Sequence, residues 1–490
     1  MSVQAWALPI TVVTSLLFLL LGVLYVRRRR LNVEEYIVAR NSAGSMLATA
    51  TLVASVIGAW ILFSPAETGT WAGMVALIGY GVGQAAPLLA FIVLGLRMRR
   101  LMPEGHSLTE YVWHRYGSAM YVFSLGVIVF YMFIFLTAEL TGIALAIHLL
   151  SQTPLWLTAL IVGLVTVAYT AYGGIRASIF TDSVQFTFIL PLLLISFFVA
   201  VVALGGFGTA FGSVTQQAPQ LLSLTHGPGI EFGVTLIIAI LAANMFHQGF
   251  WQRVYTCRDE KALRWGFASA GLLVIPVVFV AGLLGVMAVG LGVVDEPSVA
   301  LFALILEVVP TWAVLVVLVL ALVLVMSSLD TLLNGIASAV TSDLARFKPG
   351  IQGVHLLRSS RVITVVLVVP AIFIASQGYS VLYLFLIADL VCAAAVFPVF
   401  FGLYSRWLSG RAALVSSVAG LIVGALFFPT PDFTPWVPIP LAGRFVVSFG
   451  TALGASAIMS VLLSALSSRL RIVPEYDFAH LREQVHLIQG

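Results

Sequence analysis

Residues 170–193, TAYGGIRASIFTDSVQFTFILPLL, place Asp182 just inside a long apolar run that follows a pair of glycines. A carboxylate in such a run is costly, because the middle of an apolar helix offers no water to solvate its charge. Insertion scales put one aspartate at the centre of a membrane helix at about 2.5 to 3.5 kcal/mol. The stretch therefore indicates a membrane helix whose acid has a function, and it raises the question of which cation Asp182 meets.

The composition of the whole chain is that of a membrane protein. Of its 490 residues, 61% are hydrophobic and only 9% are charged, with a mean hydropathy of +1.08, whereas about 25% of the residues of soluble domains are charged. Long apolar runs recur along the chain, and they lack the period-two alternation of barrel strands. The sequence predicts an all-α polytopic protein of the cell (plasma or inner) membrane, crossing it many times.

We expect thirteen transmembrane helices from these runs. Their predicted ranges are 6–26, 44–66, 71–96, 119–149, 153–172, 181–204, 232–252, 265–290, 312–345, 362–377, 380–404, 412–428 and 445–467. The first is followed by Arg27–Arg30 and has no basic segment before it, so it is predicted to be a retained helix. Alternation from an outer N-terminus puts every one of the 24 Lys and Arg residues except Arg444 on the inner side, which predicts an N-out, C-in topology.

The chain is predicted to form one membrane domain, 1–490, built around two groups of five spans, 44–204 and 232–404. An odd number of helices per group makes the two groups point in opposite directions, as in inverted repeats. The first helix of each group has a glycine among polar and aromatic residues, Gly58 in ASVIGAW and Gly249 in NMFHQGFWQ. Unwound turns there would release backbone carbonyls towards a cavity, and close helix packing is the alternative role for these glycines. The remaining parts are the extra helix 6–26, two extra helices within 412–467 and the cytoplasmic tail 468–490.

Several acidic residues fall inside the predicted spans, where we expect no basic residue. They are Glu67, Glu139, Asp182, Asp330 and Asp389. Each must be protonated, hydrogen-bonded by neutral groups, paired with a loop cation, or neutralised by a cation from solution. The candidate loop cation for Asp182 is Arg176 at the inner surface.

The predicted helix 312–345 carries a polar stripe. Its segment 326–343, MSSLDTLLNGIASAVTSD, places polar groups at helical spacing on one face. These groups belong to Ser327, Asp330, Thr331, Asn334, Ser338 and Thr341. Serine and threonine alone could serve only to join helices, but the aspartate among them favours an ion site. Oxygen ligands suit a small hard cation such as sodium better than zinc or copper.

These stretches together resemble the sodium/solute symporter family over essentially the full length of the chain. The matching segments are EEYIVARNSAG (34–44), ASVIGAW (54–60), TAYGGIRASIFTDSVQ (170–185), FWQRVYTCRDEKALRWG (250–266) and MSSLDTLLNGIASAVTSDL (326–344). The resemblance implies a LeuT-like fold, a 5+5 inverted repeat with three extra helices. It also implies secondary active transport by alternating access, with sodium (Na+) as the coupling ion. The loop after the third span and the FWQ stretch are similar to the urea- and polyamine-transporting branch.

The same resemblance implies two cation sites. The sodium ligands carried over are Ala54, Ile57, Leu324, Ser327 and Ser328. Leu324 stands where relatives usually have alanine, but only its carbonyl is needed. A second cation site would use Asp182, Asp330 and Thr331 together with Ser327. Two carboxylates at one small site repel each other, so either a cation binds there or one acid is protonated.

The resemblance places the solute at mid-membrane between spans 2, 3, 4, 7 and 11. Candidate wall residues are Gly58, Trp60, Tyr80, Gln84, Glu139, Gln248, Phe250, Trp251 and Gln252. An anionic solute would need a buried Arg or Lys, which is not expected. Sugar-binding relatives have an asparagine near the Trp251 position, which disfavours a sugar. A small polar neutral or cationic solute of the urea, amine, polyamine or amino acid class is favoured.

Other functions stay open at this point. A proton-coupled carrier would use Asp182 or Asp330 as the titrating group, and a sensor of the same fold would bind solute without moving it. An enzyme is not expected, because GYGVGQ at 79–84 lies within a predicted span with no preceding strand. No basic tract interleaved with aromatic residues suggests nucleic acid as a partner, and the oligomeric state is not predicted.

Overall fold

The structure is a computed structural model, and it describes residues 3–26, 38–347, 353–431 and 433–485. The described residues form helices and connecting loops, and no β-strand occurs in these ranges. Arg27–Arg30, the first residues of the EEYIVARNSAG segment and the side chain of Arg176 lie outside the described part. The predicted all-helical architecture is confirmed for the part that is described.

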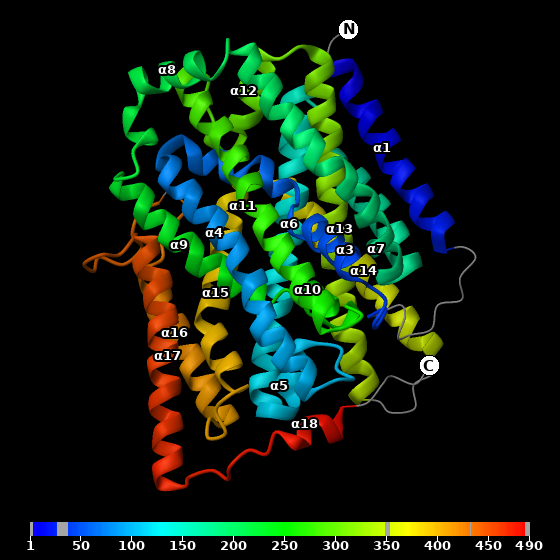
Figure 1. The fold of residues 1–490 in the computed structure, drawn as a ribbon, viewed down its shortest axis with the longest axis vertical. Helices are drawn as coiled ribbons and strands as arrows, with labels where there is room; N and C mark the ends of the chain where they lie inside the picture. The colour runs from blue at the N-terminus through cyan, green and yellow to red at the C-terminus, as the bar shows by residue number, and fades with distance from the viewer. Residues whose placement is uncertain (1–2, 27–37, 348–352, 432, 486–490) are drawn as a thin grey trace.

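Most of the long helices run along the longest axis of the molecule (Figure 1). The long helices are α1 (Val3–Val26), α4 (Ser64–Leu101), α6 (Ser118–Ser151), α7 (Leu155–Ala203), α9 (Gly227–Met245), α11 (Glu260–Leu291), α13 (Thr311–Phe347), α14 (Gly353–Ala375), α15 (Val381–Phe401), α16 (Gly410–Phe427) and α17 (Phe445–Leu470). The shorter elements are α3 (Ser45–Val56), η1 (Ala59–Leu62), α5 (Leu108–Tyr116), α8 (Phe207–Gln217), η2 (Pro219–Leu222), α10 (Gln248–Thr256), η3 (Pro297–Val299), α12 (Ala300–Val308) and α18 (Ala479–Gln484). Within the described ranges, 11 helices are long and apolar enough to cross a membrane. A multi-pass membrane protein is thereby supported, while the thirteen spans and their direction stay predictions.

Helix α13 lies at the centre of the bundle. It contacts α3, α6, α7, α10 and α14, and 78% of its most apolar segment is buried. Helix α1 lies along one flank against α7 and α13, while α16 and α17 lie on the opposite flank against α15 (Figure 1). The polar stripe predicted on the helix 312–345 therefore faces other helices, and its six side chains are buried.

Two helices of the bundle are broken at the depth of this stripe. Helix α3 ends at Val56, and Gly58 has extended backbone before η1 begins, as the predicted unwound turn requires. The second break lies between α9 and α10, at Phe246–His247, and not at Gly249 as predicted. Gly249 is helical, and a Cβ there would lie 2.7 Å from Cγ2 of Thr331. Its missing side chain serves the close packing of α10 on α13.

Two other glycine positions differ from expectation. The predicted spans 153–172 and 181–204 are not separated by a helix break at Gly173–Gly174, because α7 runs continuously from Leu155 to Ala203. Glycine permits a turn but does not by itself stop a helix. In α4, by contrast, Gly73 has a φ of +70° and separates two helical segments. The boundary between the second and third predicted spans, 44–66 and 71–96, therefore falls at Gly73.

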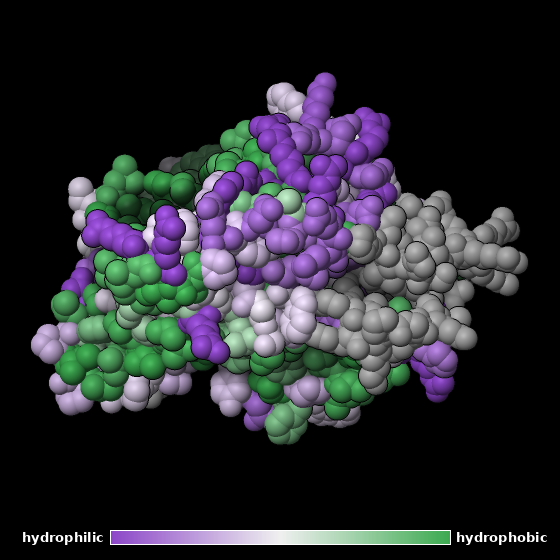
Figure 2. All heavy atoms as spheres, turned by 90° about the horizontal axis from the view of Figure 1, so that it is seen from below, coloured by the Kyte–Doolittle hydropathy of each residue, from purple (hydrophilic) through white to green (hydrophobic). Residues whose placement is uncertain are grey.

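The surface of the bundle is divided between apolar sides and a polar end. Leu16 of α1, Val366 of α14 and Leu462 of α17 are among the exposed apolar side chains. Figure 2 views the end that carries α5 and α18, where hydrophilic residues gather with apolar residues beside them. This distribution suits a protein whose sides contact lipid hydrocarbon and whose end meets head groups and water.

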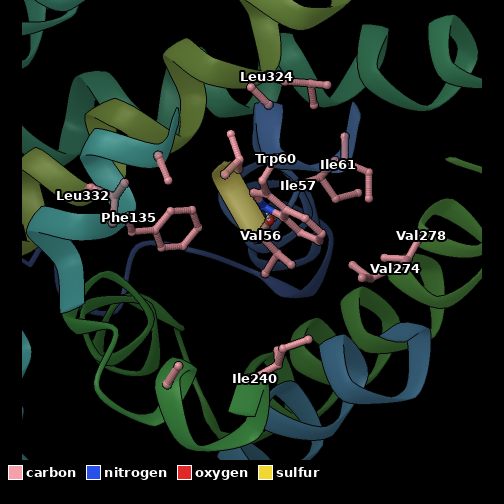
Figure 3. Close-up of a cluster of buried hydrophobic side chains, with 14 of the residues drawn as sticks. Val56, Ile57, Trp60, Ile61, Phe135, Ile240, Val274, Val278, Leu324 and Leu332 are labelled. Atoms are coloured by element: carbon pink, nitrogen blue, oxygen red, sulfur yellow. Dashed lines mark hydrogen bonds between the residues drawn. The ribbon is translucent and has the colours of Figure 1, made fainter. Parts of the chain in front are cut away.

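Apolar packing surrounds the break after α3. Val56, Ile57 and Trp60 are buried together with Phe135 of α6 and Ile240 of α9 (Figure 3). The indole Nε1 of Trp60 donates a hydrogen bond of 2.9 Å to the carbonyl of Val56. The apolar packing and this hydrogen bond therefore both stabilise the conformation of the break.

The close contact between α4 and α11 leads to a prediction about the stability of the protein. A Cβ at Gly285 would overlap the carbonyl oxygen of Ala66, whereas a Cβ at Gly126 would meet nothing within 4 Å. We expect Gly285→Ala to destabilise the protein by about 1 to 3 kcal/mol through overpacking. Gly126→Ala should leave stability unchanged or raise it, because alanine is the better helix former by about 1 kcal/mol. Thermal unfolding in detergent, followed by tryptophan fluorescence, measures both, and equal midpoints would contradict the predicted packing.

Candidate functional site

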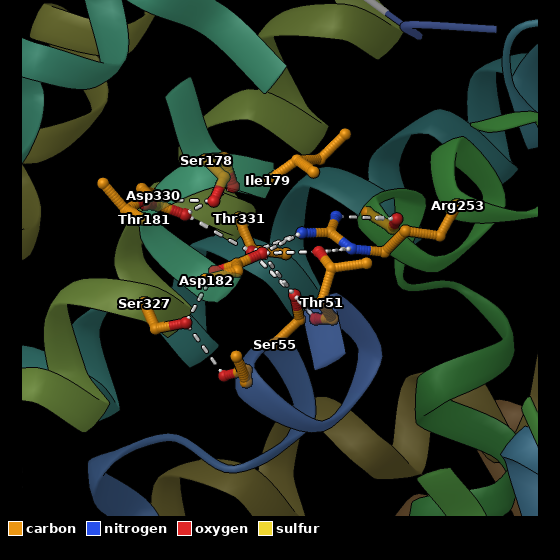
Figure 4. Close-up of polar contacts among 12 residues, drawn as sticks. Thr51, Ser55, Ser178, Ile179, Thr181, Asp182, Arg253, Ser327, Asp330 and Thr331 are labelled. Carbon is orange, nitrogen blue, oxygen red and sulfur yellow. Dashed lines mark hydrogen bonds and ion pairs between the residues drawn. The ribbon is translucent and has the colours of Figure 1, made fainter. Parts of the chain in front are cut away.

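A polar cluster lies where α3, α7, α10 and α13 meet, and Asp182 is at its centre (Figure 4). Asp182 of α7 is fully buried. Its Oδ1 accepts a hydrogen bond from Ser327 at 2.7 Å, and its Oδ2 accepts one from Thr51 at 2.6 Å. Ser55 donates to the same Oδ2 at 3.3 Å, and the Nη2 of Arg253 forms an ion pair with it at 2.9 Å. The carboxylate is thus surrounded by hydroxyl groups and one guanidinium.

Arg253 corrects the expectation that no basic residue lies within the spans. Its side chain is 1% exposed. The guanidinium donates to the carbonyl of Gly249 at 3.1 Å and to the hydroxyls of Thr331 at 3.0 Å and Thr51 at 3.3 Å. The predicted span ended at residue 252, but α10 continues to Thr256 and brings Arg253 inward. The unbroken FWQR run, with Arg253 one helical turn after Gly249, is the sequence signal that could have revealed this.

Asp330 lies beside this ion pair, and its partners in the described part of the chain are neutral. Its Oδ1 accepts from Ser178 at 2.7 Å, and its Oδ2 accepts from Tyr169 at 2.9 Å and from Thr181 at 3.2 Å. No ion pair to Asp330 occurs among the described residues. Arg253 is the one basic group among the described residues of the cluster. If Asp182 and Asp330 are both ionised, one of the two negative charges therefore has no positive partner there.

The residues predicted for the second cation site are therefore brought together. Thr331 lies between the two acids, 3.4 Å from the Oδ1 of Asp330 and 3.1 Å from the hydroxyl of Ser55. Asp182, Asp330 and Thr331 share one buried cluster, but Arg253 occupies part of the space that a second ion was expected to fill.

The residues predicted to bind sodium meet at the end of α3. In a continuous helix the carbonyl of Ala54 would accept from the amide of Gly58, but this amide donates to Val56 instead, at 3.2 Å. The freed Ala54 carbonyl lies 3.0 Å from the hydroxyl oxygen of Ser327. The neighbouring hydroxyl of Ser328 lies 3.2 Å from the Leu324 carbonyl of its own helix. Carbonyl and hydroxyl oxygens from two helices thus face each other across the break.

Glu139 of α6 supports the same break from the other side. Its Oε2 accepts from the amide of Ala59 at 2.7 Å and from the hydroxyl of Ser328 at 2.8 Å. A Cβ at Gly58 would overlap this carboxylate and lie 2.7 Å from the Ser328 hydroxyl. Glycine is therefore required at position 58, because the Glu139 carboxylate and the Ser328 hydroxyl approach the backbone there too closely for a side chain. Glu139, predicted as a wall of the solute site, instead binds backbone amides that the break leaves free.

A cavity lies beside the break, between α4, α6, α9 and α15. It comprises about 490 Å³ of space between its lining atoms, a figure that includes its open mouth. Its lining residues are Val56, Trp60, Tyr80, Gln84, Tyr131, Phe135, Leu236, Ile240, Ala243, Asn244, Phe250, Leu382, Phe385, Leu386 and Asp389. The lining is mostly aromatic and aliphatic, with a few polar groups.

Four predicted wall residues line this cavity, namely Trp60, Tyr80, Gln84 and Phe250. The others, Gly58, Glu139, Gln248, Trp251 and Gln252, do not. Gln248 accepts from the amide of Leu108 at 3.1 Å and donates to the carbonyl of His106 at 3.0 Å. Trp251 packs on Phe91 and Phe400. The short helix α10 carries Trp251 and Gln252 away from the cavity.

Sequence reasoning missed several cavity residues. Asn244, Tyr131 and Phe135 were not proposed, and Asp389 was recognised as a buried acid without a role. Their helices α6, α9 and α15 were predicted, but helical spacing alone does not tell which face of each helix meets the cavity. A lone acid in an otherwise apolar span was the available signal for Asp389.

The chain matches known transporters along most of its length. The model of the sodium:solute symporter family matches residues 36–420. A spermidine transporter of Candida albicans is 28% identical over 454 residues, with 87% of this chain and 82% of the relative covered. A urea-proton symporter of Oryza sativa is 21% identical, with 92% and 68% covered. A sodium/pantothenate symporter of Escherichia coli is 24% identical, with 88% and 92% covered.

Solved structures show the same arrangement of helices. A Na+-coupled sialic acid symporter in its substrate-bound outward-open state superposes with a TM-score of 0.77 at 17% identity, covering 94% of this chain and 98% of the other. A nucleobase-cation-symport transporter in a closed conformation gives 0.61 at 15% identity, covering 91% and 96%. The fold is thus that of LeuT-like transporters. Because the family model spans most of the chain, the protein belongs to the sodium:solute symporter family, as its motifs predicted.

Proposed function

We propose that the protein is a sodium-coupled symporter that moves a small polar neutral or cationic solute across the membrane by alternating access. The observation that carries this proposal is the meeting of the α3 break with α13. There the freed carbonyl of Ala54 lies 3.0 Å from the hydroxyl of Ser327. Together with the carbonyls of Ile57 and Leu324 and the hydroxyl of Ser328, these two oxygen atoms would offer a small cation a set of hard ligands. Family membership supports secondary active transport in general.

The proposed ion would couple to the helix arrangement through its two ligand sources. Its ligands come from the carbonyls at the end of α3 and from the Leu324 carbonyl and serine hydroxyls of α13, so it binds well only when the two helices approach. A ligand shifts a conformational equilibrium only by its difference in affinity for the two states. Sodium would therefore favour the state in which this contact is closed. At about 100 mV, inside negative, each inward charge contributes about 2.3 kcal/mol, enough to concentrate a neutral solute about fiftyfold.

The cavity supports the proposed solute class. Aromatic residues form much of its wall, and Gln84 and Asn244 supply amide groups. The buried Arg253 is engaged by Asp182 and does not line the cavity, so it offers no charge to an anionic solute there. Relatives named for spermidine and urea support urea, an amine or a polyamine as the solute, whereas the relative named for pantothenate is named for an anion.

A proton-coupled carrier is the second candidate, and Asp330 favours it. This acid is fully buried, and its described partners are the hydroxyls of Ser178, Tyr169 and Thr181. A proton would neutralise it without a bound metal ion. Under the sodium proposal, the cluster of Asp182, Asp330 and Thr331 holds a second cation beside Arg253. Under the alternative, Asp330 carries the coupling proton.

Uptake by purified protein in liposomes tests the sodium site. We expect an inward sodium gradient to drive accumulation of at least one solute from a panel of urea, amines, polyamines and amino acids. Ser327→Ala and Ser328→Ala should each raise the sodium concentration for half-maximal uptake about tenfold or more, because each removes an oxygen ligand. Ser183→Ala is the matched control, since this hydroxyl donates to the Ile179 carbonyl of its own helix. Sodium dependence unchanged in both test variants would refute the assignment.

A pH gradient applied without sodium separates the two candidate functions. We expect no accumulation by the wild-type protein under this condition, and we expect Asp330→Asn to weaken sodium-driven uptake without abolishing it, because the site at Ala54 and Ser327 stays intact. Wild-type accumulation driven by the pH gradient, if lost in Asp330→Asn, would establish the proton-coupled alternative instead.

The ion pair of Asp182 with Arg253 gives a stability prediction. Arg253→Gln leaves a buried carboxylate without its cation, which typically costs about 3 to 5 kcal/mol. We expect a lower unfolding midpoint in detergent and loss of transport. Adding Asp182→Asn to Arg253→Gln should recover part of the stability, because the uncompensated charge is then removed. A double variant no more stable than Arg253→Gln alone would argue against the pair as the cause.

A further inference from the structure

Asp389 differs from the other acids buried in the described part of the chain. It lies within α15, is 5% exposed and lines the cavity. Among the described residues, no hydrogen bond or ion pair reaches its carboxylate. Each of the other buried carboxylates accepts a hydrogen bond from a hydroxyl group; these are Glu67, Glu139, Asp182, Asp330 and Asp343. Asp389 is therefore the buried carboxylate to which no described side chain donates, and it is open to a partner from the cavity.

The cavity around Asp389 is suited to a positive charge. Trp60 and Tyr80 stack with ring centroids 5.7 Å apart, and Phe135 meets Phe385 edge-on at 4.8 Å. These four rings, together with Tyr131, line the same cavity. The face of an aromatic ring attracts a cation, most strongly where water is excluded. A carboxylate among aromatic rings therefore complements an ammonium group attached to an apolar body.

The remaining polar groups of the cavity accept or donate hydrogen bonds but carry no charge. Asn244 donates through its Nδ2 to the carbonyl of Ile240 at 3.0 Å, so its Oδ1 remains as an acceptor. No hydrogen bond of Gln84 to another described residue is found, although the side chain is 7% exposed. Both amides could bind the N–H groups of a solute that reaches beyond Asp389.

We propose that Asp389 binds the ammonium group of the solute and that the solute is a small aliphatic amine carrying a positive charge. The inference rests on the proposed function, whose solute class it narrows. A neutral solute would leave a buried carboxylate without compensation, and an anion would be repelled by it. The amine forms a charge-assisted hydrogen bond to Asp389, and the aromatic walls enclose its carbon chain.

The test combines equilibrium binding to the purified full chain with uptake into liposomes. The probes are ethanolamine, putrescine and spermidine, with urea and 1,4-butanediol as neutral counterparts; the diol is the neutral isostere of putrescine. We expect at least one amine to bind the wild-type protein, while 1,4-butanediol does not bind. Asp389→Asn should weaken this binding about tenfold or more, because the buried charge pair is lost.

Two further variants keep the test informative if Asp389→Asn folds poorly. Asp389→Glu retains the charge and should bind the amine more tightly than Asp389→Asn. Glu67→Gln removes a different buried carboxylate, one that accepts from Ser380 at 3.2 Å and does not line the cavity, and amine binding should be unchanged. Failure of all three amines to bind, or equal binding to wild type and Asp389→Asn, overturns the inference.

The outcomes separate this inference from the function on which it rests. Sodium-driven uptake of urea that Asp389→Asn leaves intact, with no amine bound, would overturn the amine site and leave the symporter proposal standing. Amine binding that depends on Asp389, without accumulation under any gradient, would support the amine site and overturn the symporter proposal. Loss of uptake driven by a pH gradient in Asp389→Asn, with amine binding unchanged, would overturn the inference by making Asp389 a proton site.

Discussion

The buried ion pair between Asp182 and Arg253 is the interaction on which the site depends. Helices in a membrane gain little from the hydrophobic effect when they pack on each other, so close packing and polar contacts hold them together. Asp182 belongs to α7 and Arg253 to α10, and the hydroxyl groups that bond to one or both of them come from α3 and α13. One charge pair therefore connects four helices of the bundle, and neither charge can be left unpaired at that depth without a large cost.

Adjacent residues of α13 carry this arrangement to the break in α3. The hydroxyl of Ser327 donates to Asp182, and the hydroxyl of Ser328 donates to Glu139. The two acids thus lie on opposite sides of the contact between α3 and α13, one beside Arg253 and one against the amides of the unwound segment. A cation bound at this contact would lie between two negative charges. Binding of the proposed coupling ion and the conformation of the α3 break therefore depend on the same two carboxyl groups.

The cavity and the polar cluster meet at the break but differ in how their charges are satisfied. In the cluster, protein hydroxyls reach both Asp182 and Asp330, and Arg253 pairs with Asp182, so these groups mainly hold helices together. In the cavity, Asp389 is buried without such a partner, and aromatic rings surround it. The break after Val56 separates the two regions, since Val56 and Trp60 line the cavity while Ala54 faces α13. Ion and solute would therefore act on the same short segment from opposite sides.

The sequence by itself determined the class of the protein, the positions of most helices, the break at Gly58 and the family. These follow from apolar runs, from local glycine and polar residues and from contiguous motifs, and each is a property of neighbouring residues in the chain. The polar face of α13 was also predictable, because helical spacing alone places Ser327, Asp330 and Thr331 on one side. Only the tertiary structure decided that Arg253 reaches Asp182, that Glu139 supports the backbone, and that Asp389 faces the cavity. Each of these depends on how far a helix continues and which face it turns to a distant neighbour, and the packing of the whole bundle sets both.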